Sequence, residues 1–153
     1  MVRVDLRSLT AENWEECLRL ELAEDQVAFV ESNAWSVAES RFHHWMLPLA
    51  IYDADNGEMV GFVMYSDERD PREPRYWVHR LMIDHRCQGR GYGRGAIYEV
   101  IRRIAAKPDG DELWIGYHPD NDVARRFYAS LGFEEIGEAP WGGDIVARLR
   151  LRV

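Results

Sequence analysis

Four glycines at alternate positions, between a run typical of a strand and one typical of a helix, constrain this chain most: Gly89, Gly91, Gly93 and Gly95. The alternation of residues 76–83 predicts the strand, and the amphipathic spacing of residues 96–106 predicts the helix. Glycine permits positive φ and close approach of a ligand, so successive N–H groups can converge on an anion. The helix adds the positive end of its dipole. The stretch therefore predicts a phosphate or pyrophosphate site.

Two other phosphate-binding patterns fit this stretch less well. Residues 91–96 match the relaxed GxGxxA fingerprint, but a dinucleotide fold needs an acid about 20 residues later, at the end of a second strand. Here the acids of residues 109–112 precede the next strand, and the loop lies mid-chain after an antiparallel half. The chain contains no GxxxxGK[ST] segment. Dinucleotide binding stays a minor alternative, beside a glycine turn that holds no ligand.

The remaining pattern predicts a mixed α/β fold. Besides residues 76–83, strands are predicted over residues 2–7, 49–53, 59–66, 113–117, 134–138 and 145–151. Helices are predicted over residues 10–20, 36–46, 96–106 and 121–131, and a capping box from Ser36 to Glu39 opens the second of them. Residues 55–57, Asp-Asn-Gly, are a hairpin signal, and Gly132 ends the last helix. Because hairpins come first and helical crossovers follow, the second half should contain neighbouring parallel strands.

Length and composition bound the class of protein. The 153 residues, 46% of them hydrophobic, suit a single domain over residues 1–153 with a real core. No run of eighteen apolar residues occurs, and the N-terminus lacks the apolar core of a signal peptide, so we expect a cytoplasmic protein without membrane contact. Cys17 and Cys87 form no CxxC pair, and we expect reduced thiols with neither a disulfide framework nor a zinc site.

The formal charge of −8 is unevenly distributed. Residues 1–40 contain nine acidic and three basic residues, a net charge of −6, whereas residues 80–103 contain six arginines and two acids. The first region suits a cationic partner and the second suits phosphates, although acids on helix surfaces often serve solubility alone. Because the acidic half would repel a phosphate backbone, nucleic acid is not an expected partner.

Two spaced motifs resemble the GNAT superfamily of N-acetyltransferases. Gln88-x-x-Gly91-x-Gly93 is similar to the Q/R-x-x-G-x-G/A motif with which that family cradles the pyrophosphate of acetyl-CoA. Residues 121–133 are similar to its N-x-x-A-x-x-x-Y-x-x-x-G-F segment, at the usual distance downstream. The resemblance extends to the order of elements along the whole chain. It implies a GNAT fold, a central twisted mixed sheet of six to seven strands with helices on both faces. It also implies acetyl-CoA as co-substrate, no metal, and acetylation of a primary amine.

The resemblance further implies which residues hold acetyl-CoA. The pyrophosphate loop corresponds to seven consecutive residues: Gln88, Gly89, Arg90, Gly91, Tyr92, Gly93 and Arg94. The strand before it corresponds to the segment whose backbone pairs with the pantetheine arm and polarises the thioester carbonyl through one N–H: Leu81, Met82 and Ile83. Asn121 and Ala124 belong to the second motif. Asn121 commonly touches the pantetheine arm in the family, or it could be merely an N-cap.

Tyr128 matches the position where many family members hold a general acid. The leaving thiolate must be protonated, and a phenol with an unperturbed pKa of about 10 suits a thiolate of similar basicity. A tyrosine packed in the core is the alternative interpretation. His79 stands where many relatives carry a glutamate that acts on the amine. A histidine could serve as a base near neutral pH, or it could be a plain strand residue.

The acceptor amine is predicted from a shorter resemblance. Residues 20–39 and 82–93 are similar to the corresponding stretches of bacterial spermine/spermidine acetyltransferases. A polyamine is a string of cations, which carboxylates and aromatic rings attract, so the predicted substrate residues are Glu21, Glu24 and Trp35. Other acceptors in this fold are a protein or ribosomal N-terminus, an amino acid and an aminoglycoside. A non-catalytic acyl-CoA-binding module is the alternative from another class, and the final strand could pair across a homodimer.

Overall fold

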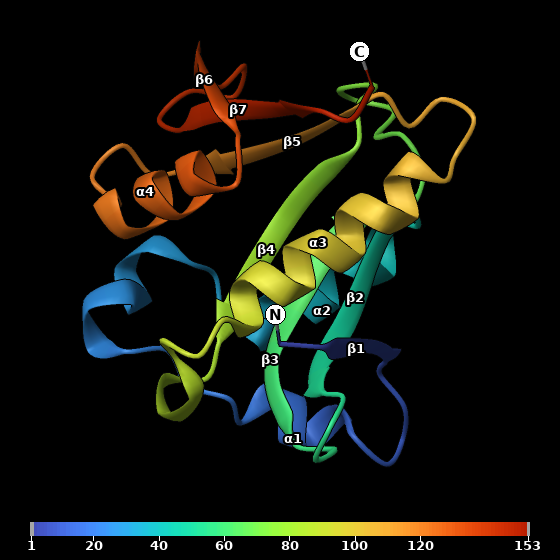
Figure 1. Cartoon of the computed structure of the whole chain (residues 1–153), viewed down its shortest axis with the longest axis vertical. Helices are drawn as coiled ribbons and strands as arrows, with labels where there is room; N and C mark the ends of the chain where they lie inside the picture. Colours follow the sequence, from blue (N-terminus) through green and yellow to red (C-terminus); the bar gives the residue numbers. More distant parts are fainter. Residues whose placement is uncertain (1, 153) are drawn as a thin grey trace.

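The computed structural model describes residues 2–152, which form a seven-stranded sheet in the order β1-β2-β3-β4-β5-β7-β6 (Figure 1). The strands are β1 Val4–Ser8, β2 Met46–Asp53, β3 Met59–Ser66, β4 Trp77–Ile83, β5 Glu112–Tyr117, β6 Glu134–Glu138 and β7 Ile145–Arg150. The helices are α1 Trp14–Leu18, α2 Asn33–Phe42, α3 Tyr92–Ala105 and α4 Asp122–Ser130, with 3-10 turns η1 Glu24–Phe29 and η2 His85–Cys87. Every described pair of strands is antiparallel except β4 and β5. The predicted mixed fold, with hairpins first and a parallel pair later, is confirmed.

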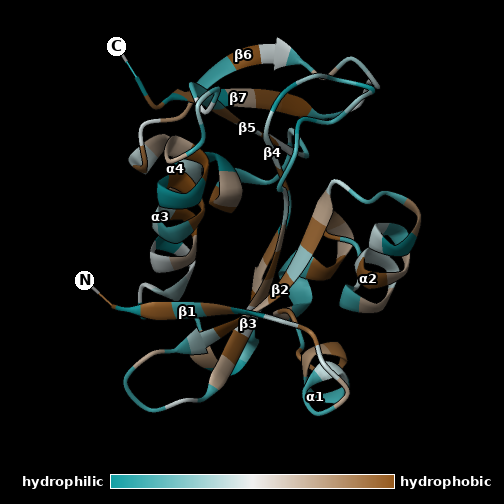
Figure 2. Ribbon diagram, turned by 90° about the vertical axis from the view of Figure 1, so that its right-hand side faces the viewer, coloured by the Kyte–Doolittle hydropathy of each residue, from teal (hydrophilic) through white to brown (hydrophobic). Residues whose placement is uncertain are grey.

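Strand alternation sends side chains to two cores, one on each face of the sheet. In β2, Leu49 and Ile51 pack into one cluster, whereas Ala50 and Tyr52 pack into the other. Residues of α3 and α4 belong to the first cluster and residues of α1 and α2 to the second, and Figure 2 shows the two pairs of helices on opposite sides. Because successive residues of a strand point to opposite faces, a sheet covered on both sides needs nearly continuous apolar strands. All eight residues of β3 are buried.

Helix α3 packs closely on the sheet. Four apolar residues of its inner face are fully buried: Ala96, Ile97, Val100 and Ile104. A Cβ at Gly95 would lie 3.0 Å from the carbonyl oxygen of Val2, so glycine lets the helix approach the segment before β1. The helix begins at Tyr92, earlier than the predicted residue 96. The prediction missed this first turn because the turn contains the alternating glycines, and glycine disfavours a helix. None of the described helices is long and apolar enough to cross a membrane.

The first two helices differ from their predicted bounds. The pattern predicts a helix over residues 10–20, but the backbone N–H of Thr10 donates to the side chain of Asn13 at 2.7 Å, and this turn delays α1. The predicted capping box at Ser36 is wrong. The hydroxyl of Ser32 caps α2 instead, accepting from Trp35 N–H at 3.0 Å, and Ser36 is buried inside the helix. The helix also ends before the predicted residue 46, because Met46 already begins β2.

β4 and β5 pair only where both begin. Their ladder consists of Trp77 with Trp114 and Val78 with Ile115. β5 pairs with β7 along its whole other edge, and β4 stays paired with β3 as far as Ile83. Figure 1 shows the two strands diverging from a shared end. One edge of β4, residues 79–83, therefore carries backbone groups that no described strand uses, and a ligand in the gap could bond to them.

A β-bulge in β4 lies at the start of this free edge. The β3–β4 register pairs Met64 with Arg80 but Tyr65 with Val78, which leaves His79 as an extra residue. The bulge changes the alternation, so Val78 and Leu81, three residues apart, pack in the same cluster. Simple alternation places His79 on the face of Leu81 and Ile83. This prediction is wrong, because the extra residue interrupts the regular alternation of β4 side chains between the two faces of the sheet.

Candidate functional site

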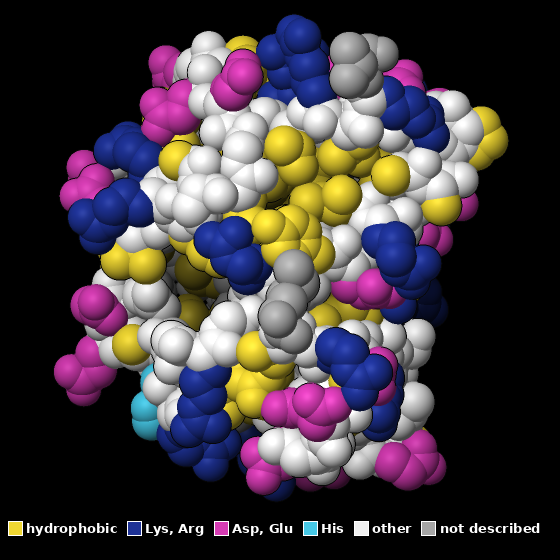
Figure 3. Space-filling view, viewed as in Figure 1, with side chains coloured by type: hydrophobic (Ala, Val, Ile, Leu, Met, Phe, Trp, Pro, Cys, Tyr) yellow, Lys and Arg dark blue, Asp and Glu magenta, His cyan; other side chains and the backbone are white. Residues whose placement is uncertain are grey.

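A cavity of about 890 Å³ opens where β4 and β5 diverge. Its walls come from the η1 segment, α2, β4, the end of β5, α4 and the turn between β6 and β7. Five residues that the sequence predicts for the site line it: His79, Leu81, Asn121, Ala124 and Tyr128. The space-filling view is hollowed between α4 and the η1 segment, with hydrophobic side chains in the hollow (Figure 3). The fold thus brings the second motif beside the strand that precedes the glycine loop.

The glycine loop follows β4 and presents unused N–H groups. Gly89 and Gly91 have φ angles of 78° and 91°, which residues with side chains rarely adopt. Within residues 2–152, nothing accepts a hydrogen bond from the backbone N–H groups of residues 88–93. Gly91 is the N-cap of α3, so the dipole of this 14-residue helix adds positive potential at the loop. These features fit a pyrophosphate group.

Two buried aspartates form hydrogen bonds with residues at the start of the loop and of α3. The fully buried carboxylate of Asp84 accepts from the backbone N–H and the Nε of Arg86, at 3.0 and 2.9 Å. Burial alone would raise the pKa of Asp84, but these hydrogen bonds outweigh it and hold the pKa below its ordinary value. The Tyr92 hydroxyl donates to Asp53 at 2.5 Å. The side chain of Tyr92 therefore belongs to the core, and only its backbone can contribute to a ligand site.

The other loop side chains connect neighbouring segments. The amide nitrogen of Gln88 donates to the carbonyl of Ile83 and to the side chain of Gln26, each at 3.1 Å. Arg94 donates to the hydroxyl of Ser130 at 2.8 Å, which joins the start of α3 to the end of α4. The exposed Arg90 makes only a long contact of 3.5 Å, to a backbone carbonyl, among the described residues. The loop is thus tied to β4, η1 and α4.

Tyr128 lies on α4 with its ring among other aromatic rings. It stacks on Tyr117 with ring centroids 6.1 Å apart, and it meets Phe127 and Phe133 edge to face at 5.0 and 5.5 Å. The residue is 9% exposed, and its hydroxyl has no hydrogen-bond partner in the described part of the chain. Burial raises the pKa of the Tyr128 phenol. The phenol is therefore protonated at neutral pH and can donate a proton.

A polar network behind Tyr128 fixes the end of β5. The hydroxyl of Tyr117 donates to Glu135 at 2.7 Å, and the same carboxylate oxygen accepts from Arg125 of α4 at 2.8 Å. Burial, together with Glu135, raises the pKa of Tyr117 to about 12. A second cavity of about 320 Å³ is lined by the three residues of this network and by Tyr128. Sequence reasoning missed Tyr117, whose only signal is its place at the end of a predicted strand.

Asn121 and Ala124 interact directly. The side-chain oxygen of Asn121 accepts from the backbone N–H of Ala124 at 3.1 Å, so Asn121 is the N-cap of α4. Both residues also line the cavity. The N-cap interpretation is confirmed, and contact with a pantetheine arm stays a prediction.

His79, the bulged residue of β4, lines the cavity beside a buried serine. Its Nε2 lies 2.8 Å from the hydroxyl of Ser66. Burial, assisted by the positive charge of Arg80, lowers the pKa of His79 to about 4. Arg80 itself pairs with Glu39 of α2 at 3.3 Å. At neutral pH the imidazole is therefore uncharged, able to accept a hydrogen bond but only weakly basic.

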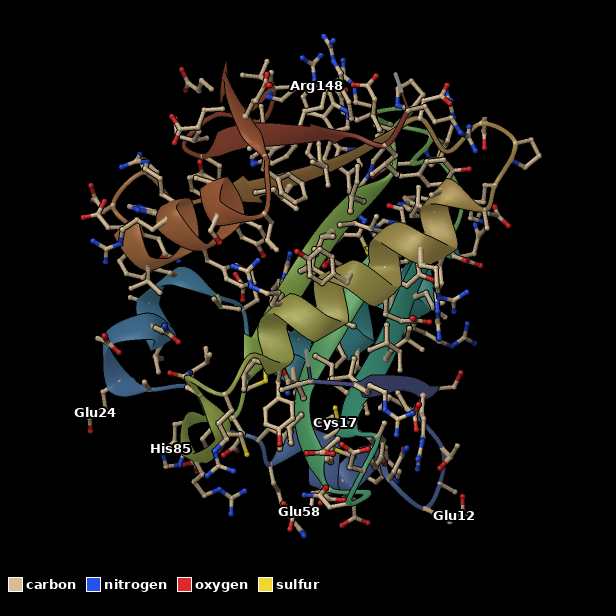
Figure 4. The ribbon with its side chains drawn as sticks, viewed as in Figure 1. Glu12, Cys17, Glu24, Glu58, His85 and Arg148 are labelled. Atoms are coloured by element: carbon tan, nitrogen blue, oxygen red, sulfur yellow. The ribbon has the colours of Figure 1, made fainter. Side chains whose placement is uncertain are left out.

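The three residues predicted to hold the amine do not line this cavity. The backbone of Glu21 bonds to Asp84 and His85, which fixes it beside the glycine loop. Glu24 points away from the molecule (Figure 4). Trp35 is 61% exposed on α2. Residues 27–31 of this segment line the cavity, whereas Glu21 and Glu24 lie outside it.

A different set of acids lines the cavity: Glu31, Glu39, Asp70, Glu73 and Asp144. Three of them pair with an arginine, in the pairs Glu39–Arg80, Asp70–Arg72 and Glu73–Arg75. Glu31 and Asp144 form no ion pair with any residue in the described range 2–152. Sequence reasoning missed this set, because nothing in the local sequence around each acid indicates that the fold brings them together.

The comparisons with known proteins agree with this geometry. Residues 6–133 match the model of the acetyltransferase (GNAT) family. The spermine/spermidine N(1)-acetyltransferase of Bacillus subtilis (strain 168) is 26% identical over 147 residues, covering 94% of this chain and 95% of that protein. The N-alpha-acetyltransferase RimI of Mycobacterium tuberculosis is 28% identical over 142 residues, covering 88% of this chain and 80% of that protein.

A solved structure has the same fold. The spermidine N-acetyltransferase from Vibrio cholerae, in complex with CoA and spermine, matches with a TM-score of 0.71 at 15% identity. The match covers 97% of this chain and 96% of that chain. It supports the mixed sheet with helices on both faces and, at this identity, the fold alone.

Proposed function

This chain belongs to the GNAT family of acetyltransferases, and we propose that it acetylates a primary amine of a polyamine such as spermidine or spermine. As a member of this family it is an acetyl-CoA-dependent N-acetyltransferase. One observation supports the acceptor above all others. Five carboxylates line the cavity beside Tyr128, and Glu31 and Asp144 have no described ion-pair partner. The relative from Bacillus subtilis is named for the same class of substrate.

The glycine loop and the gap between β4 and β5 fit acetyl-CoA as one continuous site. The pyrophosphate would lie on the N–H groups of residues 88–94, next to the N-terminus of α3. The pantetheine arm would lie along the free edge of β4 at residues 81–83, with Asn121 and Ala124 beside it. Acetyl-CoA supplies the activated acetyl group, and an N–H of β4 would polarise its carbonyl.

Tyr128 is the proposed general acid. In acetyl transfer an N–C bond forms, a C–S bond breaks, and the leaving sulfur takes up a proton. The buried phenol of Tyr128 holds its proton because burial raises its pKa. It would give that proton to the sulfur and regain one from water, while the amine loses its own proton to water. The products are an amide and a thiol, with no change of oxidation state.

His79 is proposed to hold the attacking amine by a hydrogen bond. A primary alkylammonium resembles the side chain of lysine, whose pKa is about 10.4. Transfer of its proton to an imidazole of pKa about 4 is uphill by about 9 kcal/mol, at 1.36 kcal/mol per pKa unit. A direct role as base is therefore disfavoured. If Nε2–H donates to the hydroxyl of Ser66, the unprotonated Nδ1 can accept from the N–H of an uncharged amine, which supports a positioning role.

The test is a CoA-release assay over a panel of amines. We expect kcat/KM for spermidine and spermine to exceed that for lysine, an N-terminal peptide and an aminoglycoside. A tenfold advantage for any of the last three would contradict the polyamine proposal and leave the acetyltransferase activity intact. The peptide is the most informative competitor, since RimI is also among the relatives. Binding of acetyl-CoA without turnover of any amine would indicate an acyl-CoA-binding module.

A further inference from the structure

We infer that Trp141 and Asp144, in the turn between β6 and β7, form a subsite for the second ammonium group of the acceptor. This inference rests on the proposed function, because it concerns the part of a polyamine that does not react. Both residues line the same cavity as Tyr128 and His79. Neither was predicted from the sequence, where Trp35 and the N-terminal glutamates were the expected cation-binding residues.

The turn has a defined conformation. Gly142 and Gly143 both have positive φ, 81° and 82°, a geometry that residues with side chains rarely adopt. Hydrogen bonds from Ala139 N–H to the Asp144 carbonyl at 2.8 Å, and from Gly142 N–H to the Ala139 carbonyl at 2.9 Å, close the turn. Two successive glycines and these bonds hold Trp141 and Asp144 in fixed relative positions.

The indole of Trp141 packs on neighbouring residues but remains largely exposed. It meets Trp77 edge to face with ring centroids 5.5 Å apart. It also lies over β5 at Gly116, where an added Cβ would come within 3.3 Å of the ring. Yet Trp141 is 55% exposed, whereas Trp77 is 4% exposed. An aromatic ring that is packed on its neighbours but still accessible from the cavity is suited to bind a cation.

Asp144 completes the subsite with a negative charge. One of its carboxylate oxygens accepts from the indole nitrogen of Trp141 at 2.9 Å, which joins the two side chains. In contrast to Glu39, Asp70 and Glu73 on the same cavity, Asp144 has no arginine partner in residues 2–152. A carboxylate beside an indole offers both Coulomb and cation–π attraction to an ammonium ion, and tryptophan is the strongest of the aromatic residues in this role.

This arrangement favours acceptors that carry two positive charges over acceptors that carry one. One amine would react beside Tyr128, and a second, protonated amine would lie against Trp141 and Asp144. A monoamine of similar length could use the first position but would leave the second one unoccupied. The subsite therefore predicts that the turn controls discrimination between spermidine and a simple alkylamine such as butylamine.

The experiment measures kcat/KM for spermidine and for butylamine in Trp141→Leu and in Asp144→Asn. With spermidine we expect Trp141→Leu to lose about tenfold, as a partly desolvated cation–π contact would give, and Asp144→Asn to lose about three- to fivefold, as a single ion pair would give. With butylamine each variant should lose less than about twofold. Trp35→Leu and Asp25→Asn are the matched controls, since both residues are exposed and outside the cavity. Their selectivity should equal that of the wild type. Trp141→Phe keeps a ring in the turn, and we expect an intermediate loss.

The outcomes separate this inference from the proposed function. If the wild type prefers spermidine and both variants keep that preference, the subsite is wrong and the polyamine proposal stands. If the wild type itself shows no preference for spermidine over butylamine, both are wrong. Calorimetric titration of spermidine into the CoA complex gives a second readout that does not depend on turnover. Trp141→Leu should bind spermidine about tenfold more weakly, and Asp144→Asn about three- to fivefold more weakly. Should Trp141→Leu fail to fold, Trp141→Phe and Asp144→Asn carry the test.

Discussion

The cofactor side and the acceptor side of this site differ in how far apart their residues lie in the sequence. The proposed cofactor side consists of the strand edge and the glycine loop, which come from one stretch, residues 81–94, and of α4. The acceptor wall is drawn from separate segments between residues 27 and 144. The first side offers backbone groups, whose geometry a short stretch can set by itself. The second side offers side chains that only the packed sheet brings together.

The two sides also differ in charge. The loop offers N–H groups and a helix dipole to an anion, whereas the cavity wall offers carboxylates to a cation. Substitutions should therefore separate them. A change on the cofactor side should affect acetyl-CoA binding for every acceptor, and a change on the acceptor side should depend on the charge of the amine.

The largest effect is expected where the two sides meet, at Tyr128. Tyr128→Phe keeps the stacked ring and removes the proton donor, so kcat should fall by about 10²- to 10⁴-fold with little change in acetyl-CoA affinity. Tyr117→Phe is the control, because it keeps the stack on Tyr128 and loses only the bond to Glu135. It should lose less than about tenfold. Near wild-type turnover of Tyr128→Phe across the pH range would mean that Tyr128 is structural.

The cofactor side is tested by Gly91→Val. Valine at a φ of 91° is strained, and its Cβ would lie 3.5 Å from the side chain of Val2, so the loop should change conformation and acetyl-CoA affinity should fall by about 100-fold or more. Gly57→Val is the matched control. Gly57 has a φ of 77° in the β2–β3 hairpin with no atom within 4 Å of an added Cβ, so it imposes a similar strain far from the loop.

Both variants should lose about 1–2 kcal/mol of unfolding free energy, the cost of a side chain in this backbone region. Only Gly91→Val should lose acetyl-CoA binding, as measured by calorimetry on folded protein. Equal affinity in the two variants would show that the loop does not bind the cofactor.

The acceptor side is tested by comparing two sets of glutamates. Glu31→Gln removes a carboxylate that lines the cavity, and KM for spermine should rise about three- to fivefold with kcat unchanged. The double variant Glu21→Gln/Glu24→Gln removes two charges outside it and should change KM for spermine by less than about twofold. The wild-type KM should also rise with salt, because the Debye length falls from about 10 Å at 0.1 M to about 3 Å at 1 M. A larger effect of the double variant than of Glu31→Gln on KM for spermine would support the acceptor site predicted from the sequence.

The smallest effect on catalysis is expected for the protonation of His79. Its protonation should instead change mainly the free energy of unfolding. Its pKa is about 4 in the folded protein and about 6.5 in an unfolded chain. Between these values the unfolded state binds more protons, so the unfolding free energy should fall as the pH falls from 6.5 to 4, by at most about 3 kcal/mol. His79→Gln should flatten this part of the curve in urea titrations. A pH dependence identical to that of the wild type would show that His79 titrates normally.

Much of the fold follows from local patterns. All seven strands overlap predicted ones, because either an apolar run or an alternation marks each of them in the sequence, from the fully buried β3 to the exposed edge strand β6. The helix starts were less predictable. By sequence Ser36 is the predicted cap, because Glu39 follows three residues later, yet Ser32 caps α2 and a distant contact accompanies this start. The buried side chain of Asn33 donates to the carbonyl of Cys17 at 2.9 Å, which fixes α2 against α1.

The sequence by itself indicated the glycine loop before α3, the place of Tyr128 on α4, the N-cap Asn121 and the family. Each of these depends on spacing within a single turn or helix, and such spacing is fixed by covalent geometry and local backbone preference. The tertiary structure alone decided to which face of the sheet His79 points, because a bulge in the β3–β4 ladder adds one residue to the strand. It also decided which acids line the cavity. Glu31 and Asp144 stand 113 positions apart in the chain, the difference of their residue numbers. Only the divergence of β4 from β5 gives them a common cavity.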